Sequence, residues 1–533
     1  MLWIALHLPQ ISLESLAATL PAELRQMPLA LVEARQIVAV NASAQAAGVK
    51  PGMKRATALG LAPQLVAAAA DAQRDAQALQ AVLHASLAFT PAVAALPLGE
   101  RPQADDHVVR PPRGYGQSGR ATFAHEVLLE VQASLRYFGG LPALLQRLRA
   151  ALAPLGHALQ VASAPTAQGA LLLARGAAAG ERHCADLIAL QRALAGAPLW
   201  LLDTGRAHWD ALQGMGLRTL ADLRRVPRAG LARRFGAALL DEVDRALGAR
   251  PDPRVWVTLP PAFETRLELF ARADTAEQVL HGAGVLLARL AAWLAAQHAF
   301  VRRFTLTLQH ESRQRRADTP PASAVEVLLA APSRDIAHLA LLLRERLART
   351  QLAAPALELQ LRADDIARAP PPNGELFPSA QGEREGLTRL VERLQARLGR
   401  QQVLRPQRLH DHRPEHGSAL QAVDAGALPV GDKAARADAA ARAVVTITRP
   451  VWLVSPPQPL ADRRDQPLLD GAPLQLLSGP ERIETGWWDE AGLAGRDYFI
   501  AQAADASLVW IYRLRLASLA AGAGGWYLHG RFG

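Results

Sequence analysis

The chain has 533 residues and a formal net charge of +10, which is long enough for three or more domains that each bury a core. Its single cysteine, Cys184, excludes an internal disulfide framework and a zinc site with several cysteines, and we expect it to be a buried apolar residue. We see no apolar run near eighteen residues and no secretory leader, so we expect a cytoplasmic, nucleoid-associated protein that does not contact a membrane.

Residues 1–175 are predicted to form an α/β layer domain, because short strand-like apolar runs alternate with helical stretches. The expected strands are MLWIALHL at the start, HEVLLEV from His125 and HALQVASA from His157, and the clearest helices cover residues 72–89 and 141–153. Residues 99–122 combine glycine, proline and charge without an apolar period, so we expect a mobile surface insertion there.

Residues 176–257 are predicted to be helical. Within them, ALQGMGLRTLADL contains Gly214 and Gly216, which separate two short helices in the pattern of a helix-hairpin-helix. Glycines free the backbone of such a hairpin, so that its N–H groups and the next helix N-terminus can face a phosphate. A tight corner between two helices without a ligand is the alternative.

Residues 258–365 are predicted to form a compact βαββαβ unit of ferredoxin-like character. Arg302, Arg303 and Arg313 lie in or just after its second strand, where they could follow a DNA backbone. A solvated sheet edge rich in arginine, which prevents aggregation, would give the same pattern.

Arginine makes up almost all of the basic residues. Of the 59 lysines and arginines only Lys50, Lys54 and Lys433 are lysines, which leaves 56 arginines. The planar guanidinium suits phosphate, but a GC-rich genome raises arginine, alanine, glycine and proline together. The composition therefore favours a polyanionic partner only weakly.

The last two segments differ in character. Residues 366–445 are predicted to be a linker with one amphipathic helix, whose apolar face carries Leu387, Leu390, Val391, Leu394 and Leu398. Residues 446–533 hold strand-like runs and ten of the 26 aromatic residues, which indicates a separate β-rich domain. Its tryptophans could serve a partner surface, but we favour the domain's own core for most of them. They are Trp487, Trp488, Trp510 and Trp526.

The order of these segments resembles the Y-family of translesion DNA polymerases. The motifs that carry the resemblance are NASAQAAGVKPGM from Asn41, HEVLLEVQASLRYFGG from His125 and the QGMGLRTLADL hairpin. It covers about residues 1–362 and implies a palm with fingers in 1–175, a thumb in 176–257 and a little finger in 258–365. The tail, with ELFP, LHDHRPE, GPERIETGWW and WYLHGRFG, is similar to that of Y-family-like proteins from bacterial mutagenesis cassettes.

The residues that this family uses for catalysis are missing at the matching positions. The aspartate of the first strand corresponds to His7, and the aspartate two residues later to Pro9. The second acidic pair corresponds to His125 and Glu126. The family's contacts with ribose and triphosphate correspond to Ser12, Ala42, Gln45 and Ala167.

These replacements predict a polymerase fold without polymerase activity. Two-metal phosphoryl transfer needs hard carboxylate oxygens, which imidazole and proline do not supply. His7, His125 and Glu126 would be acceptable zinc ligands. Packed or hydrogen-bonded histidines are commoner in strands, so we expect neither a metal nor another cofactor.

The resemblance also implies three kinds of partner. Primer-template DNA would be bound through its sugar-phosphate backbone, and therefore without sequence preference. The backbone-binding residues are Gly214, Gly216, Arg224, Arg225 and Arg228 in the thumb and the three little-finger arginines named above. The sliding clamp would bind Asn373, Glu375, Leu376 and Phe377, which resemble the peptide QLxLF, although an ordinary linker is the alternative. An error-prone C-family polymerase and a RecA-like accessory protein would bind the tail.

The leading hypothesis is therefore a non-enzymatic adaptor in translesion synthesis and damage-induced mutagenesis. An active Y-family polymerase with displaced metal ligands is an alternative, and it would take up deoxynucleotide with metal. A helix-hairpin-helix protein that binds DNA without any link to replication is another, and it would not bind the clamp.

Overall fold

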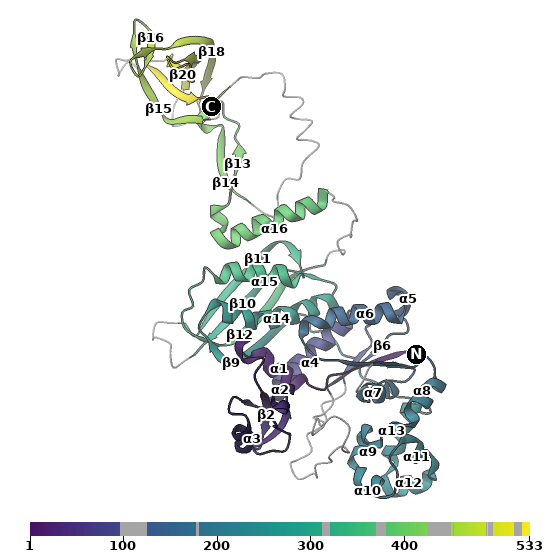
Figure 1. The fold of residues 1–533 in the computed structure, drawn as a ribbon. Helices are drawn as coiled ribbons and strands as arrows, with labels where there is room; N and C mark the ends of the chain where they lie inside the picture. The colour runs from purple at the N-terminus through teal and green to yellow at the C-terminus, as the bar shows by residue number, and fades with distance from the viewer. Residues whose placement is uncertain are drawn as a thin grey trace. The chain divides into compact units, whose positions relative to one another are not determined.

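The computed structural model describes residues 1–95, 125–176, 181–311, 320–368, 380–423, 449–450, 452–486, 488, 494–515 and 525–532. The chain divides into two compact units, Met1–Phe377 and Pro378–Gly533 (Figure 1). The predicted insertion, Arg313, the predicted clamp-binding residues and Trp487 lie outside the described residues.

A five-stranded sheet forms the centre of the first unit. Its order is β5 (Val93–Ala95), β6 (Glu126–Glu130), β1 (Trp3–His7), β7 (Gln160–Ala164) and β8 (Arg182–His183). β1 runs antiparallel to both of its neighbours, β6 and β7. The first four residues of β1 are all buried, because helices cover both faces of the sheet, and this explains their continuous apolar run.

Alternate residues of β1 point to opposite faces of this central sheet. Ile4 and Leu6 belong to the core formed with α4 (Ala72–Leu87) and α6 (Leu141–Leu152). Trp3 and Ala5 belong to the core formed with α7 (Ala167–Arg175). The predicted strands and helices of this domain are therefore confirmed. Two shorter helices complete this part of the chain: α1 (Ile11–Thr19) follows β1, and α5 (Leu135–Phe138) follows β6.

A small second sheet follows α1. It holds β3 (Gln36–Val40), β2 (Leu29–Glu33) and β4 (Val66–Ala69), with α2 (Ala42–Ala46) and α3 (Arg55–Leu61) beside it. The side-chain oxygen of Asn41 accepts hydrogen bonds from the N–H groups of Ala44 and Leu29. This one asparagine therefore both begins α2 and fixes the helix to β2.

Six helices follow in the segment that we call the helical region, residues 187–247. They are α8 (Leu187–Ala195), α9 (Asp203–Ala207), α10 (Trp209–Gly214), α11 (Leu220–Arg225), α12 (Arg228–Phe235) and α13 (Ala237–Leu247). Their apolar side chains share one core with α7, and Cys184 is buried in the same core, as predicted. The helical region is thereby joined to the central sheet through α7.

The next segment has the predicted βαββαβ order. It consists of β9 (Phe263–Ala273), α14 (Ala276–Ala296), β10 (Phe300–His310), β11 (Ala322–Ser333), α15 (Ile336–Leu347) and β12 (Ala356–Ala367). The sheet order is β11-β10-β12-β9 and all neighbouring strands are antiparallel. The second and fourth strands therefore lie at the centre, whereas the first and third do so in a ferredoxin-like sheet. The expectation holds for the element order and is wrong for the strand order.

Helix α14 corrects the expectation that the chain has no long apolar run. By length and composition Ala276–Ala296 could cross a membrane, and 61% of its most apolar window is buried inside the protein. Its side chains pack on the four-stranded sheet, and Ala292 also belongs to the core of α4 and α6. A helix that is apolar on most sides suits this position between two layers.

The second unit begins with α16 (Ala380–Leu398) and a two-stranded ribbon, β13 (Leu404–Arg408) and β14 (Ser418–Ala422). On the predicted apolar face of α16, Val391 is buried, whereas Leu387, Leu390, Leu394 and Leu398 are 37–53% exposed. The ribbon is attached to the sheet that follows, because Glu415 in its turn lies 2.8 Å from Nη1 of Arg496.

That sheet has seven strands, and Tyr498, Trp510 and Tyr512 are buried in one of its cores. Figure 1 shows that the sheet is curled. The order is β17 (Ala472–Pro473), β16 (Gln466–Leu469), β15 (Trp452–Arg463), β21 (Trp526–Arg531), β20 (Leu508–Leu514), β19 (Ala494–Gln502) and β18 (Gln475–Thr485). Trp510 and Trp526 are buried in it and Trp488 is exposed. The predicted core role is therefore confirmed for the first two.

Candidate functional site

His7 and Glu126 face each other across two neighbouring strands of the central sheet. The register of β1 and β6 places them directly opposite one another. Nδ1 of His7 lies 3.0 Å from Oε1 of Glu126, and only 1% of the glutamate side chain is exposed. Pro9 lies in the exposed turn beyond β1. The structure thus brings together two of the residues that the sequence assigns to a lost catalytic centre.

Arg175 neutralises Glu126, although no sequence motif points to it. Its Nε lies 2.6 Å from Oε1 of Glu126 and its Nη2 lies 2.8 Å from Oε2, which is a bidentate ion pair. Burial alone would raise the pKa of Glu126, but the charge and hydrogen bonds of Arg175, helped by His7, lower it to about 2. The only signal in the sequence is a single arginine at the end of the apolar helix AQGALLLAR.

The same arginine joins the central sheet to the helical region. Nη1 of Arg175 donates to the carbonyl of Leu201 at 2.7 Å and to Oδ1 of Asp203 at 3.0 Å. At this point α9 begins, and the buried Glu242 of α13 accepts hydrogen bonds from the N–H groups of Asp203 and Thr204. Glu126 therefore belongs to a polar network that fixes α7, α9 and α13 to each other.

This arrangement does not fit the magnesium ions that a Y-family centre would require. Both oxygens of Glu126 are taken by Arg175, and the residue opposite is an imidazole. Magnesium prefers oxygen ligands in a near-octahedral shell, and a buried guanidinium at this place repels cations. Within the described ranges, no three His, Cys, Asp or Glu side chains are grouped so that they could hold a metal.

His125 lies beside a second polar cluster, which joins α1 to α4. The buried carboxylate of Asp75 accepts hydrogen bonds from the hydroxyls of Ser12 at 2.5 Å and Ser15 at 2.8 Å. Nε2 of His125 lies 3.5 Å from the Ser12 hydroxyl. Burial lowers the pKa of His125, although the carboxylates of Asp75 and Glu126 act in the opposite direction. Ser12, which corresponds to the family's ribose contact, is thus engaged within the protein.

The glycine hairpin between α10 and α11 is present. Gly214 ends α10, and Gly216 has a φ of +79°, which glycine adopts without strain. The carboxylate of Asp222 accepts hydrogen bonds from the N–H groups of Arg218 at 3.3 Å and Thr219 at 3.0 Å. Two hairpin amides that could face a phosphate therefore donate to a carboxylate of the same chain.

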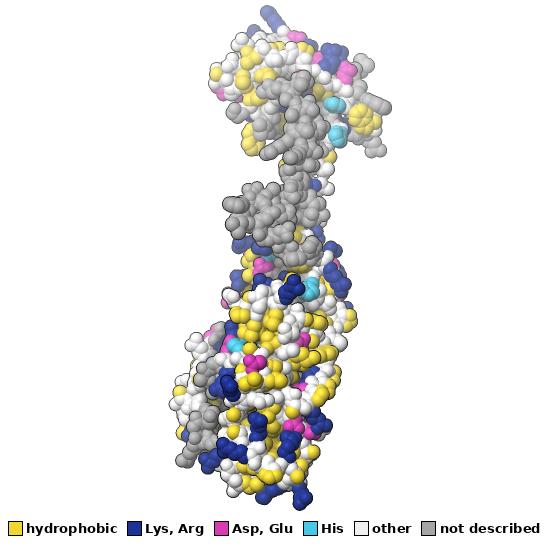
Figure 2. All heavy atoms as spheres, turned by 90° about the vertical axis from the view of Figure 1, so that its right-hand side faces the viewer, with side chains coloured by type: hydrophobic (Ala, Val, Ile, Leu, Met, Phe, Trp, Pro, Cys, Tyr) yellow, Lys and Arg dark blue, Asp and Glu magenta, His cyan; other side chains and the backbone are white. Residues whose placement is uncertain are grey.

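The predicted arginines after the hairpin lie on the surface of the helical region. Arg224 is exposed, Arg225 lies 3.7 Å from Asp222 with 80% of its side chain exposed, and Arg228 forms a bidentate pair with Asp244. Figure 2 shows basic side chains at the lower end of this unit, where Figure 1 places these helices. Further exposed arginines of the region are Arg192, Arg218, Arg233 and Arg234.

The predicted arginines of the four-stranded sheet have acidic neighbours. Arg302 is exposed, and Arg303 lies 3.7 Å from Glu326 and 3.8 Å from Asp364. Burial alternates along the strands, so one face of the sheet is open to solvent. Its charged residues include Glu264, Glu268, Glu326, Glu358 and Asp364 as well as Arg266, Arg303 and Arg362. Carboxylates are interspersed with the arginines there, so the charge of this face is mixed.

Comparisons with known proteins agree with the resemblance seen in the sequence. Residues 12–104 match the model of the impB/mucB/samB family. The chain is 28% identical over 503 residues to Protein ImuB of two Caulobacter vibrioides strains, which covers 91% of this chain and all of each relative. Similar solved structures include an insertion ternary complex of Dbh DNA polymerase (15% identity, TM-score 0.37) and DinB from Sulfolobus solfataricus (16%, TM-score 0.35). Each aligns with 69% of this chain, and with 100% and 99% of its own length respectively.

For the ion pair at Glu126 we expect that removing the cation alone destabilises the fold more than removing both charges together. Arg175→Met leaves a buried carboxylate without its cation and should lower the free energy of unfolding by about 3–5 kcal/mol. The double variant Arg175→Met with Glu126→Leu removes both charges and should recover most of that loss. Urea unfolding, together with hydrogen exchange of residues 126–130, measures both effects.

Arg149→Met is the matched control. Arg149 pairs with Glu181 on the surface, with 45% of its side chain exposed, so its loss should cost only about 0–1 kcal/mol. A double variant as unstable as Arg175→Met would contradict the structural role of the buried pair.

Proposed function

We propose that this chain, a homologue of ImuB with a Y-family polymerase-like fold, binds DNA without extending it and acts as an adaptor in translesion synthesis and damage-induced mutagenesis. The observation that carries the proposal is the state of Glu126. The carboxylate that should hold magnesium is closed by a bidentate arginine and faces a histidine.

Loss of several contacts together makes residual catalysis implausible on physical grounds. Phosphoryl transfer depends almost entirely on positioning the phosphates and on neutralising their developing charge. The positions that correspond to the family's triphosphate contacts are Ala42, Gln45 and Ala167, and alanine and glutamine carry no positive charge. Ala167 is also buried at the start of α7.

An active polymerase with displaced ligands is less well supported. Among the described residues, Asp75 beside His125 is a candidate for a replacement carboxylate, and its two oxygens already accept hydrogen bonds from Ser12 and Ser15. A metal there would have to break the contacts that join α1 to α4.

We expect the purified chain to show no Mg²⁺-dependent primer extension and no Mg²⁺-dependent deoxynucleotide uptake in calorimetry. His7→Asp should not restore either activity, because Arg175 still occupies both oxygens of Glu126. An active Y-family polymerase in the same assay is the positive control. Robust synthesis by the unmodified chain would refute the proposal.

The helical region is the surface that we propose for the DNA backbone. It exposes seven arginines, six of them from the α10–α11 hairpin to the end of α12, and two of these lie beside Asp222 and Asp244. Guanidinium groups of this kind bind phosphates independently of sequence and release counterions. We therefore propose primer-template DNA as the ligand, with Arg302 and Arg303 as secondary contacts.

Replacing Arg224, Arg225 and Arg228 with glutamine should weaken binding to primer-template DNA at every sequence tested. Each lost phosphate contact should also reduce the slope of log affinity against log salt by about 0.7–0.9. Arg303→Gln is the comparison and should have a smaller effect, since it removes one guanidinium from the secondary surface and not three from the proposed DNA surface. An unchanged slope in the triple variant would exclude these arginines from the DNA contact.

Recruitment of other proteins completes the proposal. We propose that Asn373, Glu375, Leu376 and Phe377 bind the sliding clamp, and that the tail binds an error-prone C-family polymerase and a RecA-like accessory protein, all in the cytoplasm at the nucleoid. The motif's similarity to QLxLF and its position in the sequence, directly after the segment that resembles a little finger, support the first contact. Similarity to ImuB over nearly the whole chain supports the others.

Replacing Leu376 and Phe377 with alanine should abolish clamp binding in a pull-down or calorimetric assay, because these two side chains would fill the apolar pocket of the clamp. DNA affinity should stay unchanged in the same variant. Clamp affinity equal to that of the unmodified chain would rule out this peptide.

A further inference from the structure

Within the first unit, a pocket lies where helix α14 of the β9–β12 segment meets the helices α1 and α4. Its volume is about 230 Å³, and its walls come from α1, α4, α14 and the segment 154–157. This volume is below the usual range for large organic ligands and suits a small molecule or a single ionic group. Small side chains such as Ala81 and Ala18 line much of it.

The unusual residue in this pocket is Arg289 of α14. It is 6% exposed, and its Nη1 donates to Oε1 of Gln77, Oγ1 of Thr265 and the carbonyl of Arg266, each at 3.2 Å. All three acceptors are neutral. Nε and Nη2 have no acceptor among the described residues.

A buried guanidinium without a carboxylate is costly, because taking a charge out of water requires a compensating partner. Burial alone lowers the pKa of Arg289, to about 10, and no acidic group counteracts it. Glu242 and Glu126 show the usual arrangement elsewhere in the same unit, where each buried carboxylate has several donors. Among the described residues, no carboxylate pairs with Arg289 in this way.

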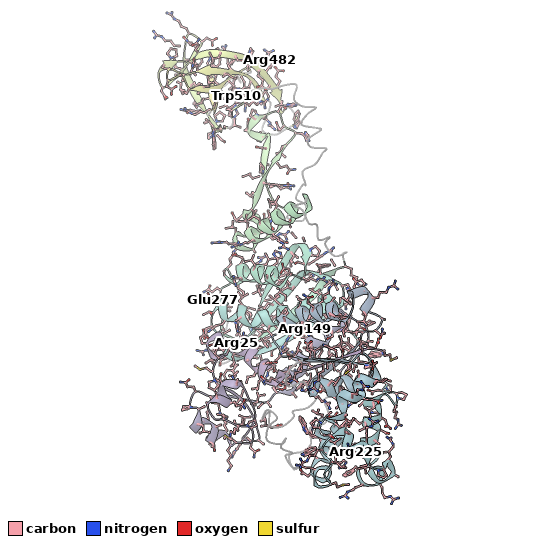
Figure 3. All side chains as sticks on the ribbon, turned by 45° about the vertical axis from the view of Figure 1, so that its right-hand side comes forward. Arg25, Arg149, Arg225, Glu277, Arg482 and Trp510 are labelled. Carbon is pink, nitrogen blue, oxygen red and sulfur yellow. The ribbon has the colours of Figure 1, made fainter. Side chains whose placement is uncertain are left out.

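The other polar groups of the pocket point to the same ligand chemistry. The one carboxylate in its wall, Glu14, is occupied by Nδ1 of His157 at 3.2 Å and by the N–H of Ala158 at 3.0 Å. Arg25 lines the mouth of the pocket, and Figure 3 shows it on the N-terminal part of the chain beside the four-stranded unit. Its Nη2 donates to the carbonyl of Ala18 at 3.3 Å.

We propose that this pocket binds a compact oxyanion, a phosphate or carboxylate group, which pairs with Arg289 and is closed in by Arg25. Guanidinium groups bind both anions through parallel N–H donors. The ligand would contact α1 and α4 on one side and α14 on the other. It would therefore stabilise the junction between the central sheet and the four-stranded unit, independently of whether the chain synthesises DNA.

Isothermal calorimetry and thermal unfolding of the full chain test the proposal, with potassium phosphate compared with potassium chloride at equal ionic strength. Phosphate should bind and raise the unfolding midpoint, since a ligand of the native state stabilises it. Arg289→Met should weaken binding about ten- to a hundredfold, which is the usual effect of losing a charge-assisted contact. Arg149→Met, a surface arginine labelled in Figure 3, should bind like the unmodified chain.

Two further variants keep the test valid if Arg289→Met folds poorly. Arg25→Met removes the exposed cation at the mouth, and Ala18→Leu narrows the pocket without changing its charge, so each should also weaken phosphate binding. Potassium acetate and deoxyadenosine triphosphate, both with chelator present, distinguish a carboxylate or nucleotide source from free phosphate. No difference between phosphate and chloride, or equal binding by all pocket variants, would overturn the proposal.

Discussion

The buried ion pair between Glu126 and Arg175 is the constraint on which the first unit depends. A carboxylate in the middle of a covered sheet cannot remain unpaired, and here the cation comes from the end of α7. The same guanidinium reaches Leu201 and Asp203, where the helical region begins. The pair thereby joins two parts of the fold, since one guanidinium holds both oxygens of Glu126 and also reaches the start of α9.

Local patterns in the sequence were sufficient for most of the fold. The apolar run of β1, the helical periodicity of residues 72–89 and the glycines of the hairpin each depend on neighbours a few residues away. The candidate site was predicted only in part for the same reason. His7 and Glu126 were found through a family pattern, but Arg175 lies 49 residues from Glu126 in the sequence, and Arg289 lies 212 residues from Gln77. No periodicity reports contacts over such distances.

Two expectations were wrong, the strand order of the four-stranded sheet and the absence of a long apolar run. The strand order depends on which strands pair, which the order of elements leaves open. The acidic neighbours of Arg303 were missed for the same reason, because Glu326 and Asp364 lie on β11 and β12. The apolar helix Ala276–Ala296, in contrast, was overlooked although its length and composition can be read from the sequence.

The contact between Glu415 and Arg496 changes how the segment before the curled sheet must be understood. It joins the ribbon of β13 and β14 to β19, so the ribbon belongs to the same compact body as the curled sheet. A ribbon of only two strands is marginally stable in water, so this carboxylate supplies support that the two strands lack by themselves.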